Sequence, residues 1–237
     1  MPGNVAQMVS AIIVAAGRGT RMGSNADKLF LEIAGRPIVA HTWRRFDAAK
    51  CIDHIVLVVR DGCQRAFEQL GKHLGLNKPF SLVSGGLERQ DSVWNGLQAL
   101  PSATTIVAIQ DAARPCTSEE LIAATIEAAR KVGAAVAAQP VKDTVKESAD
   151  GQFVERTLDR SRLWAVQTPQ SFQLEIIRRA LLEVRRRQLL VTDDAAACEL
   201  IGQPVKLVVS LSPNPKVTTP SDIPYITSLL GHGAGRA

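Results

Sequence analysis

The chain has 237 residues, of which 46% are hydrophobic and 22% are charged, so it can bury a full core as one large domain. Its formal net charge of +5 suits an anionic partner, either nucleic acid or a phosphorylated metabolite. Aromatic residues make up only 4% of the chain, whereas nucleic-acid surfaces often interleave aromatics with Lys and Arg, so basicity alone does not identify the partner.

Short apolar runs predict buried strands, and segments with helical periodicity lie between them. The predicted strands are 10–16, 54–59, 80–84, 104–110, 133–141 and 205–211, and the predicted helices are 37–49, 89–100, 118–132 and 178–187. This alternation predicts an α/β fold: a single domain over 1–237 with a Rossmann-like, mostly parallel sheet and helices on both faces.

The segment 141–164 interrupts this alternation. Its Thr and Val residues alternate with charged residues around Asp150-Gly151, and an Asp-Gly pair between alternating segments is typical of a β-hairpin. An isolated two-stranded hairpin is marginally stable in water, so we expect this β-arm to pack on another surface, such as a second subunit. A solvated surface excursion is the alternative that the residues leave open.

The first predicted strand leads into a glycine-containing loop, AAGRGTRMG at 15–23. The loop matches neither the dinucleotide fingerprint, because its third glycine arrives one place late, nor the P-loop, because no Lys-Ser or Lys-Thr follows a glycine. Arg21 and Lys28 nevertheless place two cations near backbone donors, which suits a polyphosphate. The alternative is a pair of surface cations.

Two further motifs, SGG at 84–86 and DAARP at 111–115, follow predicted strands, so they would meet the first loop at the carboxyl edge of the sheet. In DAARP at 111–115, Asp111 could hold Mg²⁺ and Arg114 could contact a phosphate or Asp111 itself; an ordinary turn is the alternative. Gly85 and Ser92 could accommodate a flat base, or could simply form a turn and a capped helix. Lys216 follows the last predicted strand, where a lone lysine usually has no special function.

Cysteine and histidine spacing argues against a metal centre built from these residues. The four cysteines form no C-x-x-C pair and the four histidines no H-x-x-x-H pair, so a zinc site is not expected. The first ten residues lack a signal-peptide pattern, and no apolar stretch is long enough to span a bilayer. We therefore expect a reduced, cytoplasmic protein with no membrane partner.

Taken in order, the motifs resemble those of the 2-C-methyl-D-erythritol 4-phosphate cytidylyltransferases of the non-mevalonate isoprenoid pathway. The resemblance spans roughly 200 residues and is carried by AAGRGTRM, Lys28, SGGLERQDSV, DAARP, VKDTVK, TLDR, QTPQSF, TDDA and NPKVTTPSD. It implies transfer of CMP from CTP to 2-C-methyl-D-erythritol 4-phosphate, which gives 4-diphosphocytidyl-2-C-methyl-D-erythritol and pyrophosphate, with Mg²⁺ as cofactor.

The resemblance also implies roles for individual residues. It assigns catalysis to Arg21, Lys28, Arg160 and Lys216, CTP binding to Ala15, Ala16, Gly17, Gly19, Gly85, Ser92 and Ala112, acceptor binding to Arg114, Thr144, Arg160, Thr192 and Lys216, and metal binding to Asp111. It further implies a homodimer in which each arm reaches the partner's site. Segment 212–216 offers no second carboxylate, so Asp111 and substrate oxygens would coordinate the metal.

Two other functions remain as alternatives. A ribitol 5-phosphate cytidylyltransferase would share the loop chemistry and differ in its acceptor, although DAARP and TLDR resemble the methylerythritol enzymes more closely. A non-catalytic nucleotide or nucleic-acid binder would suit the basic charge. Such a protein needs no cation pair directed at phosphorus, so Lys28 and Asp111 argue against it, and no nucleic-acid partner is expected.

Overall fold

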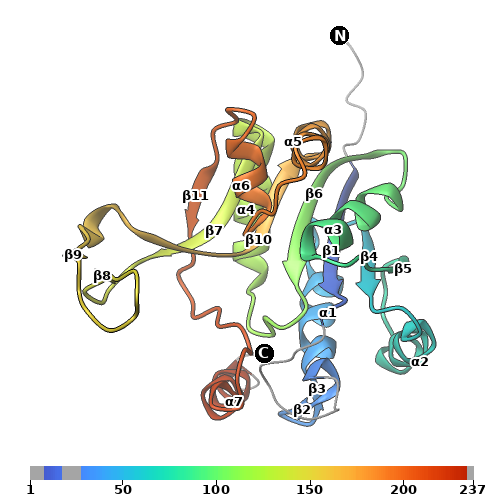
Figure 1. Cartoon of the computed structure of the whole chain (residues 1–237). Coiled ribbons are helices and arrows are strands. Elements are labelled where there is room, and N and C mark those ends of the chain that lie inside the picture. Colours follow the sequence, from blue (N-terminus) through green and yellow to red (C-terminus); the bar gives the residue numbers. More distant parts are fainter. Residues whose placement is uncertain (1–7, 18–27, 234–237) are drawn as a thin grey trace.

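The computed structural model describes residues 8–17 and 28–233, and Figure 1 shows a sheet covered by helices with an arm projecting from one side. The main sheet has seven strands in the order β11-β7-β10-β6-β1-β4-β5. Its strands are β1 (Met8–Ala15), β4 (His54–Val59), β5 (Phe80–Ser84), β6 (Thr104–Asp111), β7 (Ala134–Pro140), β10 (Trp164–Gln173) and β11 (Lys206–Val209). All neighbours pair in parallel except β10, which is antiparallel to β6 and β7.

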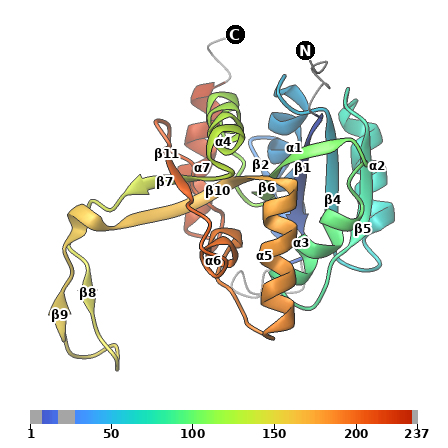
Figure 2. The ribbon, with the colours of Figure 1, turned by 90° about the horizontal axis from the view of Figure 1, so that it is seen from above.

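Helices cover both faces of this sheet, as the alternation of elements predicts. The first face carries α1 (Ile38–Ala48), α2 (Gln64–Leu74), α4 (Glu119–Val132) and α7 (Asp222–Gly233), and the second carries α3 (Arg89–Gln98), α5 (Leu174–Arg186) and α6 (Asp194–Glu199). Short 3₁₀ turns lie at Lys28–Phe30 and Arg160–Arg162. Figure 2 shows the two helical layers from above. Each layer packs on its own buried apolar cluster, so the sheet is buried on both sides.

The helix ends follow local sequence signals. The Ser118 hydroxyl accepts a hydrogen bond from the Leu121 amide at 3.2 Å, and two glutamates occupy the first turn of α4, where they complement the helix dipole. A capping box formed by Glu88 and Asp91 begins α3. This cap fixes the start of α3 beside the carboxyl edge of the sheet.

Helices α2, α6 and α7 were not predicted, and among the strands of the main sheet β10 is the one that the apolar pattern does not predict. Its sequence, WAVQTPQSFQ, lacks an apolar run, and its Gln170 and Ser171 are buried polar residues. Ser171 forms a 2.9 Å hydrogen bond with Thr125, and the Gln170 side chain binds the amides of Asp194 and Ala195. Specific partners therefore make burial of this strand tolerable, which hydrophobic periodicity cannot reveal.

The arm lies between β7 and β10, and Figures 1 and 2 show it extending away from the body. Its tip is a small antiparallel sheet of β8 (Lys146–Glu147) and β9 (Arg156–Thr157). The Asp150-Gly151 pair lies in the connection, where the Asp150 carboxylate accepts hydrogen bonds from the amides of Gln152 and Phe153. The predicted hairpin is confirmed, with a connection (148–155) longer than a two-residue turn.

A second small hairpin pairs β2 (Glu32–Ile33) with β3 (Arg36–Pro37) just before α1. Its turn contains Ala34 and Gly35, whose φ angles of 47° and 75° are both positive. Glycine adopts this conformation readily, whereas alanine does so at a steric cost. The hairpin begins shortly after Lys28, so the segment from Lys28 to α1 is a tightly folded connection.

Candidate active site

Strand register brings the predicted motifs to one edge of the sheet. Val14 of β1 pairs with Asp111 of β6, and Ala15 pairs with Val59 of β4. The amide of Gly85 then donates to the Val59 carbonyl at 2.8 Å, which draws the loop after β5 to the same edge. Neighbouring parallel strands therefore end together, and the start of the glycine loop (15–17), the SGG loop (84–86) and DAARP converge as predicted.

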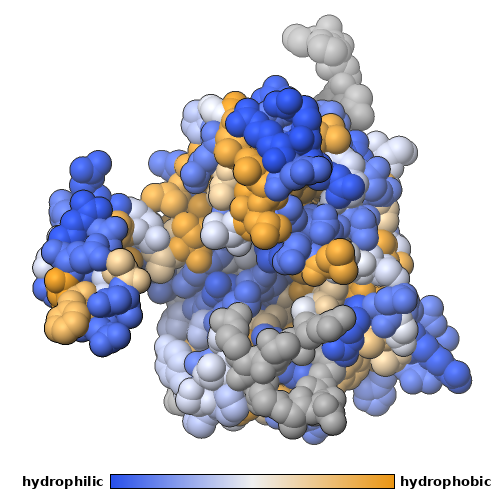
Figure 3. Space-filling model, in the orientation of Figure 1, coloured by the Kyte–Doolittle hydropathy of each residue, from blue (hydrophilic) through white to orange (hydrophobic). Residues whose placement is uncertain are grey.

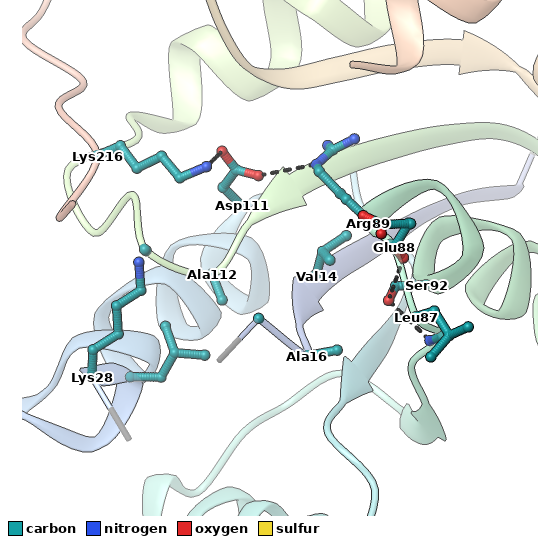
Figure 4. A pocket seen from close by; sticks show the side chains of 14 residues that line it. Val14, Ala16, Lys28, Leu87, Glu88, Arg89, Ser92, Asp111, Ala112 and Lys216 are labelled. Carbon is teal, nitrogen blue, oxygen red and sulfur yellow. Dashed lines mark hydrogen bonds and ion pairs between the residues drawn. The ribbon is translucent and has the colours of Figure 1, made fainter. Parts of the chain in front are cut away.

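A pocket of about 180 Å³ lies at this convergence. Its lining includes Ala16, Gly17, Lys28, Gly86, Leu87, Arg89, Ser92, Asp111, Ala112 and Lys216, and Figure 4 shows several of these side chains around it. The structure thus brings together much of the residue set expected to bind CTP. Gly19 and Arg21 lie outside the described residues.

Asp111 is the centre of charge in the site. Its Oδ2 lies 2.8 Å from Lys216 Nζ and 3.5 Å from Arg114 Nε, and its Oδ1 lies 3.5 Å from Arg89 Nε. Burial favours the neutral acid, but Lys216, Arg89 and Arg114 outweigh it and lower the pKa of Asp111 to about 2. The carboxylate is therefore ionised at neutral pH and meets three cations.

Arg89, at the first position of α3, links Asp111 to a second carboxylate. Its Nη2 donates to Asp194 Oδ2 at 2.8 Å, and the Asp194 side chain is only 1% exposed. Burial raises the pKa of Asp194, although the charge of Arg89 opposes that shift. For Arg89, burial lowers the pKa, but the charges of Asp194 and Asp111 outweigh burial and the net shift is upward. The motifs SGGLERQDSV and TDDA contain Arg89 and Asp194, but neither residue was predicted to belong to the site.

Asn214 directs Lys216 into the site. The Asn214 side chain is buried and donates to the Thr168 carbonyl at 2.8 Å, while its Oδ1 accepts from Thr117 at 2.9 Å. The Asn214 carbonyl accepts from Arg114 Nη1 at 2.7 Å. These contacts fix the backbone ahead of Pro215, so Lys216 points toward Asp111.

Lys28 also lines the first pocket, and Figure 4 shows it on the same side as Lys216. Its Nζ donates to the Val217 carbonyl at 3.2 Å, and the Val217 amide donates to the Ala113 carbonyl at 2.8 Å. Thr42 of α1 also holds the DAARP loop, because its hydroxyl donates to the Ala112 carbonyl at 2.8 Å. Lys28 and Lys216 are thereby joined through one short stretch of backbone.

Gly85 is required by close packing. A Cβ atom at this position would lie 2.3 Å from Ala16 Cβ and 2.9 Å from Ser92 Oγ, which is too close for either contact. Ser92 is buried, accepts from the Gly86 amide at 3.1 Å and donates to the Glu88 carbonyl at 3.2 Å. Both residues shape the SGG loop where it closes on the end of β1.

A second pocket, of about 170 Å³, adjoins the first. Arg89, Asp111 and Lys216 line both pockets, while Arg114 and Thr192 line the second only. The three shared side chains therefore form a charged wall between two spaces. The geometry provides room for two anionic groups, one on each side of this wall.

Thr144 and Arg160 lie on the arm and line neither of these pockets in their own chain. Arg160 Nη1 donates to the Lys142 carbonyl at 2.6 Å, within the arm itself. Both side chains are exposed or nearly so.

The donor set fits a magnesium ion that also binds substrate oxygens. No group of three or more His, Cys, Asp or Glu side chains suited to a metal occurs within residues 8–17 and 28–233. Asp111 does supply a hard, ionised oxygen donor beside the pockets, and Mg²⁺ is commonly held by one or two carboxylates together with phosphate oxygens and water. An ion here would compete with Lys216 for Asp111 Oδ2.

The chain matches proteins of known class over almost its whole length. The model of the 2-C-methyl-D-erythritol 4-phosphate cytidylyltransferase family matches residues 9–231. The enzyme of that name from Pelotomaculum thermopropionicum is 44% identical over 229 residues, which are 96% of each chain, and the one from Geobacillus thermodenitrificans is 44% identical over 93% of this chain and 96% of its own. The crystal structure of 4-diphosphocytidyl-2C-methyl-D-erythritol synthase from Anaerococcus prevotii superposes with a TM-score of 0.84 at 32% identity, covering 95% of this chain and 96% of that one.

The α/β fold and the cation-rich site at its carboxyl edge thus define a nucleotidyltransferase. Within that class, the chain belongs to the 2-C-methyl-D-erythritol 4-phosphate cytidylyltransferase family, and the resemblance drawn from its motifs is confirmed.

Proposed function

We propose that this chain transfers CMP from CTP to 2-C-methyl-D-erythritol 4-phosphate, with the nucleotide in the first pocket and the acceptor phosphate in the second. The observation that carries the proposal is the wall formed by Asp111, Arg89 and Lys216, which both pockets share. A reaction between two polyanions needs such a place, because their mutual repulsion must be offset before phosphorus and nucleophile can approach.

The reaction needs no covalent enzyme intermediate. An acceptor phosphate oxygen attacks the α-phosphorus of CTP, a new P–O bond forms, and the bond to the β-phosphate oxygen breaks to release pyrophosphate. The acceptor oxygen is already ionised at neutral pH, so it needs placement more than deprotonation. We assign that placement to Lys216, Arg114 and Thr192, and stabilisation of the developing charge to Lys28 and Arg21.

The nucleotide would be held by backbone and by the SGG loop. Ala15, Ala16, Gly17 and Gly19 belong to the loop proposed to surround the triphosphate, with Ala112 opposite, while Gly85 and Ser92 shape the proposed cytosine subsite. Asp111 would hold Mg²⁺ against the phosphates, where the ion would supply charge neutralisation for the triphosphate. Lys216, which lines both pockets, would bind the acceptor phosphate.

We also propose a homodimer in which each arm completes the partner's acceptor pocket through Thr144 and Arg160. Phe153 and Val154 on the arm are 75% and 61% exposed, and the neighbouring edge strand exposes Leu207 and Val209. Figure 3 shows apolar surface on the arm and on the adjoining side of the body. Exposed apolar residues on a thin hairpin and on an edge strand support burial against a second copy.

Exchange of active-site residues between subunits can be tested by complementation. Lys28→Ala and Arg160→Ala homodimers should each be nearly inactive. After unfolding and random reassembly, about half the dimers are mixed and each has one intact site, so activity should recover to about a quarter of wild type. Mixed samples as inactive as either parent, with heterodimers confirmed by mass, would mean that each arm serves its own subunit or no site.

The acceptor is tested by following pyrophosphate release from CTP and Mg²⁺. We expect release with methylerythritol phosphate and little or none with ribitol 5-phosphate or with no acceptor. Preference for ribitol 5-phosphate would identify the sister activity, and binding of CTP without turnover on either acceptor would identify a non-catalytic binder.

A cytoplasmic location also belongs to the proposal. Cys51, Cys63, Cys116 and Cys198 are all free thiols, which is usual in a reducing compartment. Among the described residues, no helix is long and apolar enough to cross a membrane.

A further inference from the structure

A separate pocket of about 560 Å³ lies on the outer face of α1 and shares no lining residue with the two pockets of the active site. Helix α1 contributes His41, Arg44, Arg45 and Ala48 to it. These positions follow the spacing i, i+3, i+4, i+7, which places them on one helical stripe. The wall of the pocket is therefore one face of α1.

The β2–β3 hairpin forms a second wall and adds a third guanidinium. Its turn residues Ala34 and Gly35 line the pocket together with Arg36. Their positive φ angles fold the hairpin tightly before α1 begins, and His41 Nε2 lies 2.7 Å from the Ile33 carbonyl, which ties the hairpin to the helix. Arg36 is thereby held beside the arginines of α1.

The charges of this pocket are unbalanced. Glu119 is its only acidic lining residue, and none of the three arginines makes an ion pair with any residue in the described part of the chain. Arg44 Nη1 donates only to the Leu74 carbonyl, at 3.3 Å. Burial and the charges of Arg36 and Arg45 lower the pKa of His41 below 6.5, although its backbone hydrogen bonds oppose that shift, so the imidazole is mostly neutral at pH 7. The lining then carries two net positive charges.

We propose that this pocket, defined by Arg36, His41, Arg44 and Arg45, is a binding site for a small organic phosphate monoester. A phosphate monoester carries about −1.5 to −2 charges at pH 7, which matches the unbalanced charge of the lining. Guanidinium groups bind phosphate through paired hydrogen bonds. Ala34, Ala48 and Leu230 supply apolar surface for a short carbon chain, and the volume exceeds what a bare phosphate needs.

The site can be tested by nuclear magnetic resonance titration of the full chain with glycerol 3-phosphate and, separately, with inorganic phosphate. Saturable shifts of the backbone amides of residues 33–48 report this pocket, whereas shifts at residues 111–116 report the active site. The test variant is Arg44→Gln/Arg45→Gln. A matched control, Arg65→Gln/Lys72→Gln, removes two charges from exposed positions on α2.

We expect saturable shifts at residues 33–48, at least a tenfold weaker affinity in the test variant, and unchanged affinity in the control. Arg114→Gln should weaken the response at residues 111–116 and leave the response at 33–48 intact. Glycerol 3-phosphate should bind the pocket more tightly than inorganic phosphate because of the apolar lining. Equal binding by the test variant and the wild type would overturn the proposal. Equal affinity for glycerol 3-phosphate and inorganic phosphate would overturn the claim that the site prefers an organic phosphate. None of these readouts depends on cytidylyl transfer.

Discussion

Neutralising Asp111 should destabilise the folded chain, although this residue is assigned to substrate binding. Its pKa is lowered from 3.8 to about 2 in the folded state, and each pKa unit corresponds to about 1.4 kcal/mol. The charged form therefore contributes about 2 kcal/mol to the free energy of unfolding at neutral pH, after the burial penalty has been offset. In Asp111→Asn this contribution is lost, and Lys216, Arg89 and Arg114 repel one another without their shared counter-ion.

The pH dependence gives the prediction a distinctive signature. Because the folded-state pKa is depressed, the contribution is complete above 3.8 and disappears as the pH falls toward 2. The stability difference between wild type and Asp111→Asn should thus be about 2 kcal/mol at pH 7 and about half that at pH 3. Urea unfolding of the ligand-free protein at both pH values measures it, with Glu68→Gln on the exposed face of α2 as the control for one lost negative charge.

Two results would refute this reasoning. An Asp111→Asn variant as stable as wild type at pH 7 would mean that the ion pairs of Asp111 do not contribute to the free energy of unfolding. Such a result is typical of active sites that are strained in the absence of ligand. A difference that stays constant down to pH 3 would assign the loss to packing or hydrogen bonding instead of charge.

Three further predictions concern the same edge of the sheet. Lys28→Ala should lower kcat by about 100-fold or more and change the KM for CTP much less, because the Lys28 charge is needed chiefly as the transition state forms. Steady-state kinetics in which only KM rises would contradict this prediction. Gly85→Ala should lower the free energy of unfolding in urea by about 1–3 kcal/mol and raise the KM for CTP, since the added Cβ would lie 2.3 Å from Ala16 Cβ. Unchanged stability and an unchanged KM would show that the loop can move to accommodate the added methyl group. Asp194→Leu should destabilise the fold by about 3–5 kcal/mol, because Arg89 loses its 2.8 Å partner and keeps only the longer contact with Asp111. Restoration of stability by Arg89→Met in the same chain would show that the poorly paired charge is the cause.

Much of the fold could be predicted because its signals are local. Buried parallel strands need apolar runs, and β4 and β5 coincide with the predicted segments 54–59 and 80–84. Strand β10 was missed because Gln170 and Ser171 are buried with partners from other elements, and such partners are separated from the strand in sequence. A polar strand of this kind can be recognised only once its neighbours are known.

The candidate site was likewise predicted only where its signals are local in the sequence. Asp111 and Lys28 could be predicted because each stands next to a strand or loop of recognisable type, and the structure places both at the first pocket. Arg89 could not be singled out, because its position depends on Asp194, more than a hundred residues later in the chain. The ordered motifs identified the family, but a motif alone does not show which of its side chains meet.

Asp111 is in contact with three cations, Arg89, Arg114 and Lys216, and this local excess of positive charge would help the proposed site to hold two anions that repel each other. Asp111 and Asp194 together face Arg89, Arg114 and Lys216, so the two carboxylates order the cations without neutralising all of them. If Asp111 holds Mg²⁺ as we propose, Lys216 would be available to an acceptor phosphate in the second pocket, which its side chain already lines. Binding of the first substrate would then supply the charge that holds the second. This order of events requires the acceptor to bind more tightly after CTP and Mg²⁺ than before, and the Lys216→Ala variant to lose that difference.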